Sequence, residues 1–318
     1  MKKVKSINVC TQYKMDMHNV NGNESTSPKN VNGRNYISGQ KIRFMLLETI
    51  KELSNNNVQI STSDGVQCDI ANDLRSDLAG YMNTSEGNYA SRRTSPLQVG
   101  FALATKQSNY FEDLFVRFKT NPTTNEQNKQ RINDKTYSES DIFNFNYMLD
   151  CSMLSTSEYF TYDKEKFVER MFIKHVSEKE RKNRANLFLM GTSYLKGLAN
   201  QSRNAVDNKA KKVFICFDSI SIFKKYFEMS DTEKSDLLSD LDKRNIPYFI
   251  GGEGESMGVN EAYEKACQKL DILELEDYSK EILTQDEVKA KYSKNLSLDE
   301  AETKSKKKKE NSESENVE

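Results

Sequence analysis

The sequence predicts an α+β fold built around one antiparallel sheet, and three observations support this prediction. The expected elements follow one another in the order strand, helix, strand, strand, helix, strand. One of the strands alternates apolar and polar residues, which is typical of a sheet that helices cover on a single face. Long polar insertions separate the elements without changing their order. A ferredoxin-like βαββαβ unit with large insertions accounts for all three observations.

The first strand and the first helix are expected near the amino end of the sequence. Residues 4–10 alternate in polarity, with Ile7 and Val9 on one face. An Asn- and Gly-rich loop over 13–36 follows, and loops of that length are usually functional or disordered. Ser38 is a good N-cap, and the apolar residues after it recur at helical spacing. These residues are Ile42, Met45, Leu46, Thr49, Ile50 and Leu53.

The middle of the chain combines two polar insertions with the clearest strand. The insertions cover 54–90 and 119–140. Between them, the pattern of 97–104 fits a strand or a helix, and that of 110–118 fits a strand. Alternation over 142–154 predicts an antiparallel strand that is buried on one side. Its apolar face carries Phe143, Phe145, Tyr147, Leu149 and Cys151, and its polar face carries Asn144, Asn146 and Asp150.

The last part of the chain returns to helices and strands before a charged tail. Helical sequence is expected over 163–198 in two pieces, because Ser177 and Glu180 form a capping box at the start of the second piece. From residue 285 onward the sequence is charged and nearly free of aromatic residues, which is typical of disorder. We therefore expect one domain over 1–284 and a charged, flexible tail over 285–318. The other expected elements are a strand at 213–217, helices at 221–228 and 234–243, a strand at 248–250 and a helix at 260–271.

The charge of the chain is balanced overall but is unevenly distributed. The whole sequence has 47 basic and 48 acidic side chains, a formal net charge of −1. Residues 1–218 have 31 basic and 24 acidic side chains (+7), whereas residues 219–318 have 16 and 24 (−8). Nucleic-acid-binding surfaces are basic, so the first region is the candidate for such a surface.

Composition narrows the class of protein further. No stretch is long and apolar enough to predict a transmembrane helix, and the first residues lack the pattern of a signal peptide. The five cysteines are far apart and form no CxxC pair, so we expect reduced thiols, mostly buried, in a cytoplasmic protein that does not bind membranes. The sequence has two histidines, which argues against a zinc site of the usual type.

No catalytic motif stands out. A Gly-rich segment at 252–258 resembles a dinucleotide-binding loop, but its last interval is one residue too long and glutamates replace the phosphate contacts. Neither His18 nor His175 has a nearby Ser or Cys that would suggest a catalytic triad, and we expect His175 to be structural. We therefore expect no catalytic residue, no cofactor and no bound metal.

Three groups of basic and amide residues lie at loop ends within the basic region. Taken singly, each group is also typical of ordinary solvent-exposed surface. Taken together, they suit a sugar-phosphate backbone better than flipped bases, because they offer cations and hydrogen-bond donors without an aromatic run. The first group also lies in the opening turn of a helix, where the dipole favours an anion. The groups are Gln40, Lys41 and Arg43; Arg92 and Arg93; and Gln201, Ser202, Arg203 and Asn204.

Four motifs in order resemble a known family. They are NGRNYISGQKIRFMLLETI, DLRSDLAGYM, RRTSPLQVGFALA and GLANQSRN. Together they resemble the DevR-type backbone subunit of CRISPR Cascade complexes, the seventh Cas protein of type I systems. Among type I systems the resemblance is to subtype I-B, and the family is part of the RAMP superfamily. The resemblance extends over residues 4–250 and does not cover the two insertions in detail or the charged tail.

The resemblance implies an RRM-like palm with finger and thumb insertions, the fingers over 58–90 and the thumb over 119–140. Such subunits stack head to tail as a helical filament along one CRISPR RNA and present it for pairing with target DNA. Base pairing then carries the sequence specificity, and the protein contacts the guide through its backbone and shape. The implied partners are CRISPR RNA, target DNA through the guide, further copies of the chain and other Cascade subunits.

The resemblance also assigns roles to the basic and amide groups. Ser38, Gln40, Lys41 and Arg43 would contact guide phosphates across the palm, and Arg92 and Arg93 would lie beside the guide. The guide would be held from the other side by Gln201, Arg203 and Asn204. In the thumb insertion, the cations implied as contacts are Lys119, Lys129 and Arg131.

Two departures from related proteins shape the prediction. RRM proteins stack bases on sheet aromatics, whereas Phe143, Phe145 and Tyr147 are expected in the core here. Related subunits of type III effectors cleave RNA with an aspartate in the loop after the first strand. In this chain that loop opens on Asp16 and otherwise offers Glu24, so we predict no nuclease activity.

Two alternatives stay open from the sequence. One is a metal-dependent endoribonuclease of the same superfamily, with Asp16 or Glu24 as its candidate residue. The other is a protein-interaction module without RNA, in which the acidic C-terminal region carries the function.

Overall fold

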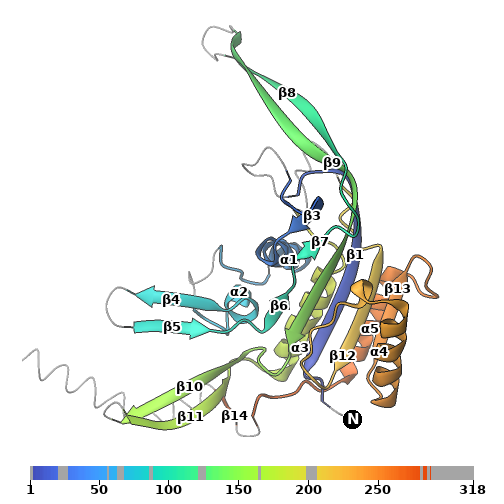
Figure 1. The fold of residues 1–318 in the computed structure, drawn as a ribbon. Helices are drawn as coiled ribbons and strands as arrows, with labels where there is room; N and C mark the ends of the chain where they lie inside the picture. The colour runs from blue at the N-terminus through green and yellow to red at the C-terminus, as the bar shows by residue number, and fades with distance from the viewer. Residues whose placement is uncertain are drawn as a thin grey trace, which may run out of the picture.

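The predicted α+β fold is confirmed in the computed structural model of the chain. The structure describes residues 3–20, 28–55, 57–62, 68–85, 89–120, 127–163, 166–197, 206–279, 282–284 and 287. Figure 1 shows a central sheet with helices packed against it and three long two-stranded hairpins that project from it. The described residues include five α-helices and several antiparallel sheets.

The central sheet has the strand order of a ferredoxin-like unit. Its strands are ordered β13-β12-β1-β9-β6, and every neighbouring pair is antiparallel. Within it, β9 lies between β1 and β6. The four strands β12-β1-β9-β6 therefore follow the order of a ferredoxin-like βαββαβ unit, in which each β-α-β pair of strands has another strand between its members. The strands are β1 (Ser6–His18), β6 (Leu97–Val99), β9 (Gln127–Asp150), β12 (Lys212–Asp218) and the extra edge strand β13 (Tyr248–Gly252).

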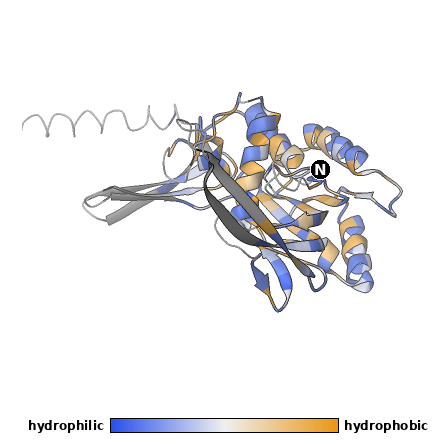
Figure 2. Ribbon diagram, turned by 90° about the horizontal axis from the view of Figure 1, so that it is seen from above, coloured by the Kyte–Doolittle hydropathy of each residue, from blue (hydrophilic) through white to orange (hydrophobic). Residues whose placement is uncertain are grey.

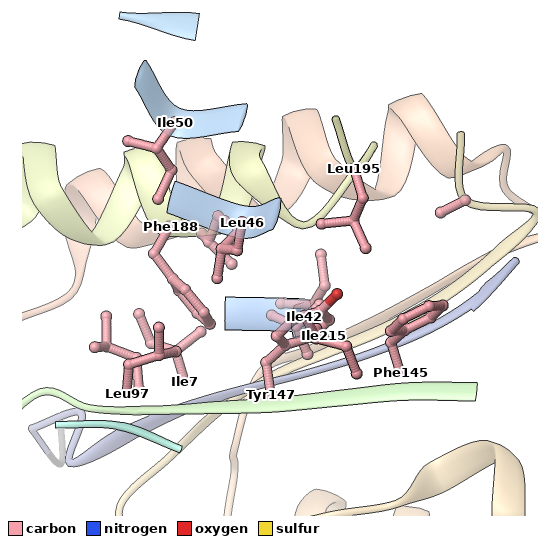
Figure 3. Close-up of a cluster of buried hydrophobic side chains, with 14 of the residues drawn as sticks. Ile7, Ile42, Leu46, Ile50, Leu97, Phe145, Tyr147, Phe188, Leu195 and Ile215 are labelled. Atoms are coloured by element: carbon pink, nitrogen blue, oxygen red, sulfur yellow. The ribbon is translucent and has the colours of Figure 1, made fainter. Parts of the chain in front are cut away.

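Three helices cover one face of this sheet and form the main core with it. They are α1 (Gly39–Leu53), α3 (Glu178–Gly191) and α5 (Val259–Ile272). Figure 3 shows side chains from the helices and strands meeting in this layer. The alternation of β9 directs its aromatic residues inward, and Phe143, Phe145 and Tyr147 are fully buried, as predicted. In Figure 2 the helices carry hydrophobic residues on one side and hydrophilic residues on the other.

The opposite face of the sheet is covered only in part. A 3-10 turn, η1 (Tyr226–Glu228), and α4 (Asp231–Lys243) lie over β12 and β13. The rings of Phe214 and Tyr226 stack there with centroids 4.3 Å apart. Toward β9 this face carries polar side chains, among them Asn144, which accepts a hydrogen bond from Gln12 at 3.1 Å.

The projecting hairpins are inserted between successive elements of the basic unit. The longest pairs β8 (Tyr110–Thr120) with the first part of β9. A second pairs β4 (Tyr81–Ser85) with β5 (Tyr89–Arg93), next to the short helix α2 (Leu74–Leu78). In a third, β10 (Thr156–Asp163) pairs with β11 (Lys166–Lys174), and β14 (Ile282–Thr284) adds to β11 in parallel. A small sheet joins β2 (Asn30–Val31), β3 (Arg34–Ile37) and β7 (Ala102–Leu103).

The prediction of a helix over 163–198 is wrong in its first half. Residues 166–174 form strand β11, in which Met171 and Ile173 are buried and their neighbours are more exposed, a period of two. In the second half the helix is confirmed over Glu178–Gly191 but ends before the predicted boundary at 198. It begins after Ser177, whose hydroxyl accepts a hydrogen bond from the Glu180 backbone N–H at 3.3 Å.

Several other boundaries differ from the sequence prediction. The first strand continues to His18, because its partner β9 is also longer than expected and pairs with it over that whole length. The predicted helix over 221–228 is reduced to the turn η1. The segment 97–104 forms the two strands β6 and β7. The helix at the N-cap Ser38 is confirmed.

The five cysteines are free thiols. Cys68 is exposed, whereas the thiols of Cys10, Cys151 and Cys216 are buried. Within the described ranges, no helix has both the length and the apolar character to cross a membrane, and no three metal-ligating side chains cluster. The predicted tail over 285–318 lies, except for residue 287, outside the described residues.

Candidate nucleic-acid interface

The amino end of α1 presents the first predicted group at the surface. The Ser38 hydroxyl accepts a hydrogen bond from the Lys41 backbone N–H at 3.2 Å, and this contact caps the helix. Gln40 is exposed and Lys41 is half-buried. Burial lowers the pKa of the Lys41 ammonium, which lies 5.6 Å from the Phe44 ring centroid. A cation at a free helix amino end is a suitable contact for a phosphate.

Arg43 also contributes to the fold. Its Nη2 atom donates to the Leu97 carbonyl oxygen at 3.3 Å, which connects α1 to the edge strand β6. The start of α1 also lies close to the end of β6. A Cβ atom added to Gly39 would be only 2.9 Å from the Val99 carbonyl oxygen, so the backbone approaches here too closely for a larger residue. The structure therefore places the amino end of α1 directly against residues 99–100.

Arg93 has a different environment from the one that the sequence predicts. Its side chain is buried, and Nη2 forms an ion pair with the Asp77 carboxylate at 2.7 Å. Asp77 also accepts from Arg184 at 2.6 Å and from the Ser155 hydroxyl at 2.6 Å. Because the guanidinium is enclosed in this cluster, it is not available to a phosphate, and we remove Arg93 from the RNA contacts.

The remaining predicted site residues are placed only by their backbone or lie outside the described residues. Arg92 lies in β5 beside Arg93, and Lys119 lies in β8. Lys129 and Arg131 lie in β9, so these three thumb cations are on the β8–β9 hairpin. Gln201, Arg203 and Asn204 fall outside the described part of the chain.

A buried carboxylate at the base of the β8–β9 hairpin was not predicted. Asp141 accepts hydrogen bonds from four side chains at 2.7–2.9 Å: His18, Asn35, Ser108 and Ser138. Burial raises the pKa of the Asp141 carboxyl, but the four hydrogen bonds outweigh burial and lower it to about 2. The cluster joins β1, β3 and the segment just before β8 to β9, so it fixes the hairpin on the sheet. Alternation in the sequence identifies β9 but gives no indication of these partners.

Asp16, the candidate nuclease residue, lies in strand β1 and not in the loop after it. Its side chain is 57% exposed and lies 3.5 Å from Lys14, and it accepts from the Ser140 hydroxyl at 2.5 Å. Glu24 lies outside the described residues.

The fold is shared with chains of solved CRISPR complexes. Two solved structures, described as a CRISPR RNA-guided surveillance complex and as a CRISPR RNA-guided surveillance complex in a pre-nicking state, contain similar chains. The first gives a TM-score of 0.53 at 13% identity and the second 0.55 at 9% identity. Each match covers 83% of this chain and 99% of the other chain. At this identity the likeness is one of fold.

The family is shown by the sequence itself. The sequence model of the family described as CRISPR-associated negative auto-regulator DevR/Csa2 matches residues 47–214, more than half of the chain. The protein belongs to this DevR/Csa2 family. No curated protein matches the chain.

Proposed function

We propose that this chain is a non-catalytic, RNA-binding backbone subunit of a Cascade surveillance complex. Its membership of a CRISPR-associated family carries the proposal, and the fold it shares with chains of surveillance complexes supports it. Several copies would stack along one CRISPR RNA and present it to target DNA. We assign the chain to the RAMP superfamily and to subtype I-B on the four sequence motifs.

The guide would run past the amino end of α1. Gln40 and Lys41 offer donors and a cation there, and Ser38 and Arg43 hold that end of the helix in place. The β8–β9 and β4–β5 hairpins project from the body of the molecule in Figure 1, and we assign them as the thumb and the fingers. Contacts of this kind read a backbone and not a sequence, as a guide-holding subunit requires.

Co-expression with a CRISPR array tests this function. The purified protein should carry excess absorbance at 260 nm and protect RNA of uniform length. Protein that arrives free of RNA and monomeric would contradict the proposal and favour a protein-interaction module.

The absence of catalysis is a separate part of the proposal. We expect labelled guide or target RNA to stay intact with the protein and Mg²⁺. Cleavage that Asp16→Ala abolishes would instead identify a metal-dependent endoribonuclease.

A further inference from the structure

A pocket of about 530 Å³ lies near the β13 edge of the central sheet. Several elements begin or end there: Val4 precedes β1, Phe217 is near the end of β12, and Leu273 follows α5. The amino end of α1 lies against β6, which forms the opposite edge of the sheet (Figure 1). The pocket is therefore separate from the surface that we propose for the guide, and its volume is usual for a ligand site.

The floor of the pocket is apolar. Val4, Phe217 and Leu273 are buried side chains of the main core. Ile246 is a buried side chain of the smaller cluster that α4 covers, and Pro247 continues the lining toward β13. Because core packing fixes these residues, the floor is formed before any ligand arrives, and an aliphatic side chain placed on it is removed from water.

The rim of the pocket is positively charged. Of the ten described residues that line it, three are cations and none is acidic. Arg244 is paired with Asp218 at 2.6 Å and with Asp240 at 2.8 Å. Lys3 and Lys269, in contrast, form no ion pair with any residue that the structure describes.

The two lysines therefore have charge left for a ligand. Asp277, whose carboxylate interacts with Lys3, already forms two other ion pairs, at 2.8 and 2.9 Å. Ser219 and Asn245 also line the pocket, and neither side chain has a hydrogen-bond partner within the described ranges. A cationic rim of this kind contrasts with the net charge of −8 of residues 219–318.

These features favour a peptide over a nucleic acid. Phe217, the one aromatic residue among the described lining residues, is 1% exposed, so a base cannot stack on it. The guanidinium of Arg244, the group best suited to a phosphate, is taken by two carboxylates. An apolar floor with single ammonium groups at its rim instead matches an aliphatic side chain flanked by carboxylates, as in protein interfaces with an apolar centre and a charged rim.

We propose that this pocket binds an acidic peptide segment of a partner protein. One aliphatic side chain of the peptide lies on the apolar floor, and the carboxylates beside it pair with Lys3 and Lys269. Ser219 and Asn245 donate hydrogen bonds to the same segment. The inference goes beyond the proposed function, because it concerns a protein partner and a surface that does not contact the guide.

Fluorescence anisotropy of the full-length protein with a labelled peptide tests the pocket. The peptide is Gly-Ser-Asp-Glu-Leu-Glu-Asp-Ser-Gly, which has one leucine between two pairs of acidic residues. A peptide with serine in place of leucine should bind at least about 10-fold more weakly, because it has no aliphatic group to bury. A peptide with Asn and Gln in place of Asp and Glu should also bind more weakly and lose the dependence on salt.

Two double variants of the protein locate the binding site. Lys3→Gln combined with Lys269→Gln removes both unpaired charges and should weaken binding of the acidic peptide about 2- to 30-fold. Lys234→Gln combined with Lys265→Gln is the matched control. It removes the same charge from two ammonium groups that are already in ion pairs on α4 and α5 and do not line the pocket.

The remaining outcomes would overturn the inference. Equal binding of the leucine and serine peptides, or an equal loss in the two double variants, removes the pocket as a peptide site. Displacement of the peptide by excess single-stranded RNA assigns the two lysines to nucleic acid. Binding that appears only after deletion of residues 285–318 identifies the chain's own C-terminal segment as the occupant, and binding only at concentrations where the protein is monomeric identifies a second copy.

Failure of this inference is distinguishable from failure of the proposed function. The peptide titration contains no guide RNA, so a negative result leaves RNA binding by the α1 surface standing. A protein that binds the peptide as expected but carries no RNA would contradict the proposed function and leave the peptide site in place.

Discussion

At the scale of single residues, buried charges in this protein hold elements together, whereas a partly buried charge at the surface is a candidate for a contact with a partner. Arg93 and Asp141 belong to the first kind. Lys41 belongs to the second kind, since it is half-buried at the amino end of α1. Desolvation of a cation strengthens its interaction with a phosphate, so partial burial favours this position as a contact.

Lys41 provides the most direct test of the RNA surface. Lys41→Ala should weaken RNA binding and reduce the dependence of log K on log salt by about 0.7, the value for one single-strand phosphate contact. Titrations at several salt concentrations measure both quantities. The control is Lys265→Ala on α5, where the ammonium is paired with Glu261 at 2.8 Å. An unchanged affinity and slope for Lys41→Ala would remove this residue from the interface.

The lowered pKa of the Asp141 carboxyl predicts that part of the stability of the fold is lost in acid. Its pKa is lowered from the ordinary value of 3.8 to about 2, so the ionised carboxylate stabilises the folded state above pH 4, by roughly 2 kcal/mol. This contribution is lost as the pH falls from about 4 to 2. Asp141→Asn should therefore lower the free energy of unfolding at pH 7, and the gap to the wild type should close on acidification. Urea denaturation at pH 7, 4 and 3 measures the gap, and a gap independent of pH would contradict the prediction.

At the scale of elements, buried clusters fix the hairpins on the sheet. Asp141 joins the β8–β9 hairpin to β1 and β3. Asp77, in α2, joins the β4–β5 hairpin to α3 through Arg93 and Arg184. In each case one carboxylate collects donors from elements far apart in the sequence, because a buried charge is tolerated only when it is fully paired.

Replacement of Arg93 distinguishes a structural role of this residue from a role in RNA binding. Arg93→Ala leaves the Asp77 carboxylate with one guanidinium partner in a buried site, so we expect a loss of about 3 kcal/mol of unfolding free energy. RNA affinity, measured at a temperature where the variant is folded, should change less than for Lys41→Ala. A large loss of affinity with unchanged stability would return Arg93 to the interface.

At the scale of the whole molecule, the charge divides between two regions of the chain. The acidic excess of residues 219–318 lies mainly before residue 285, because 285–318 contain 8 basic and 9 acidic side chains. Within the described region, α4 alone has five acidic residues and two basic residues. The segment over 285–318 therefore contributes little to the net charge of the protein.

Deletion of residues 285–318 should leave RNA binding intact. The deletion changes the net charge by one and removes none of the residues that we place at the interface. Affinity and salt dependence of the shortened and full-length proteins, measured side by side, test this expectation. A clear loss of affinity on deletion would assign the run of lysines at 306–309 to RNA binding.

The sequence by itself determined the order of the core strands and helices, the start of α1 and the inward face of β9. These depend on local signals: a capping serine, a helical period and a strict alternation of apolar residues. It also singled out Gln40 and Lys41, because charge and position along the chain are local properties. The tertiary structure alone decided that 166–174 is a strand, since its partner β10 and the added β14 satisfy its backbone groups.

Tertiary structure also decided the roles of Arg93 and Asp141. Whether an arginine meets a phosphate or a buried carboxylate depends on residues 16 and 91 positions away, here Asp77 and Arg184. The cluster around Asp141 combines side chains from β1, β3 and β9, which no local pattern connects. Local sequence sets the conformation of each element, but burial and pairing of charges are set by what packs against it.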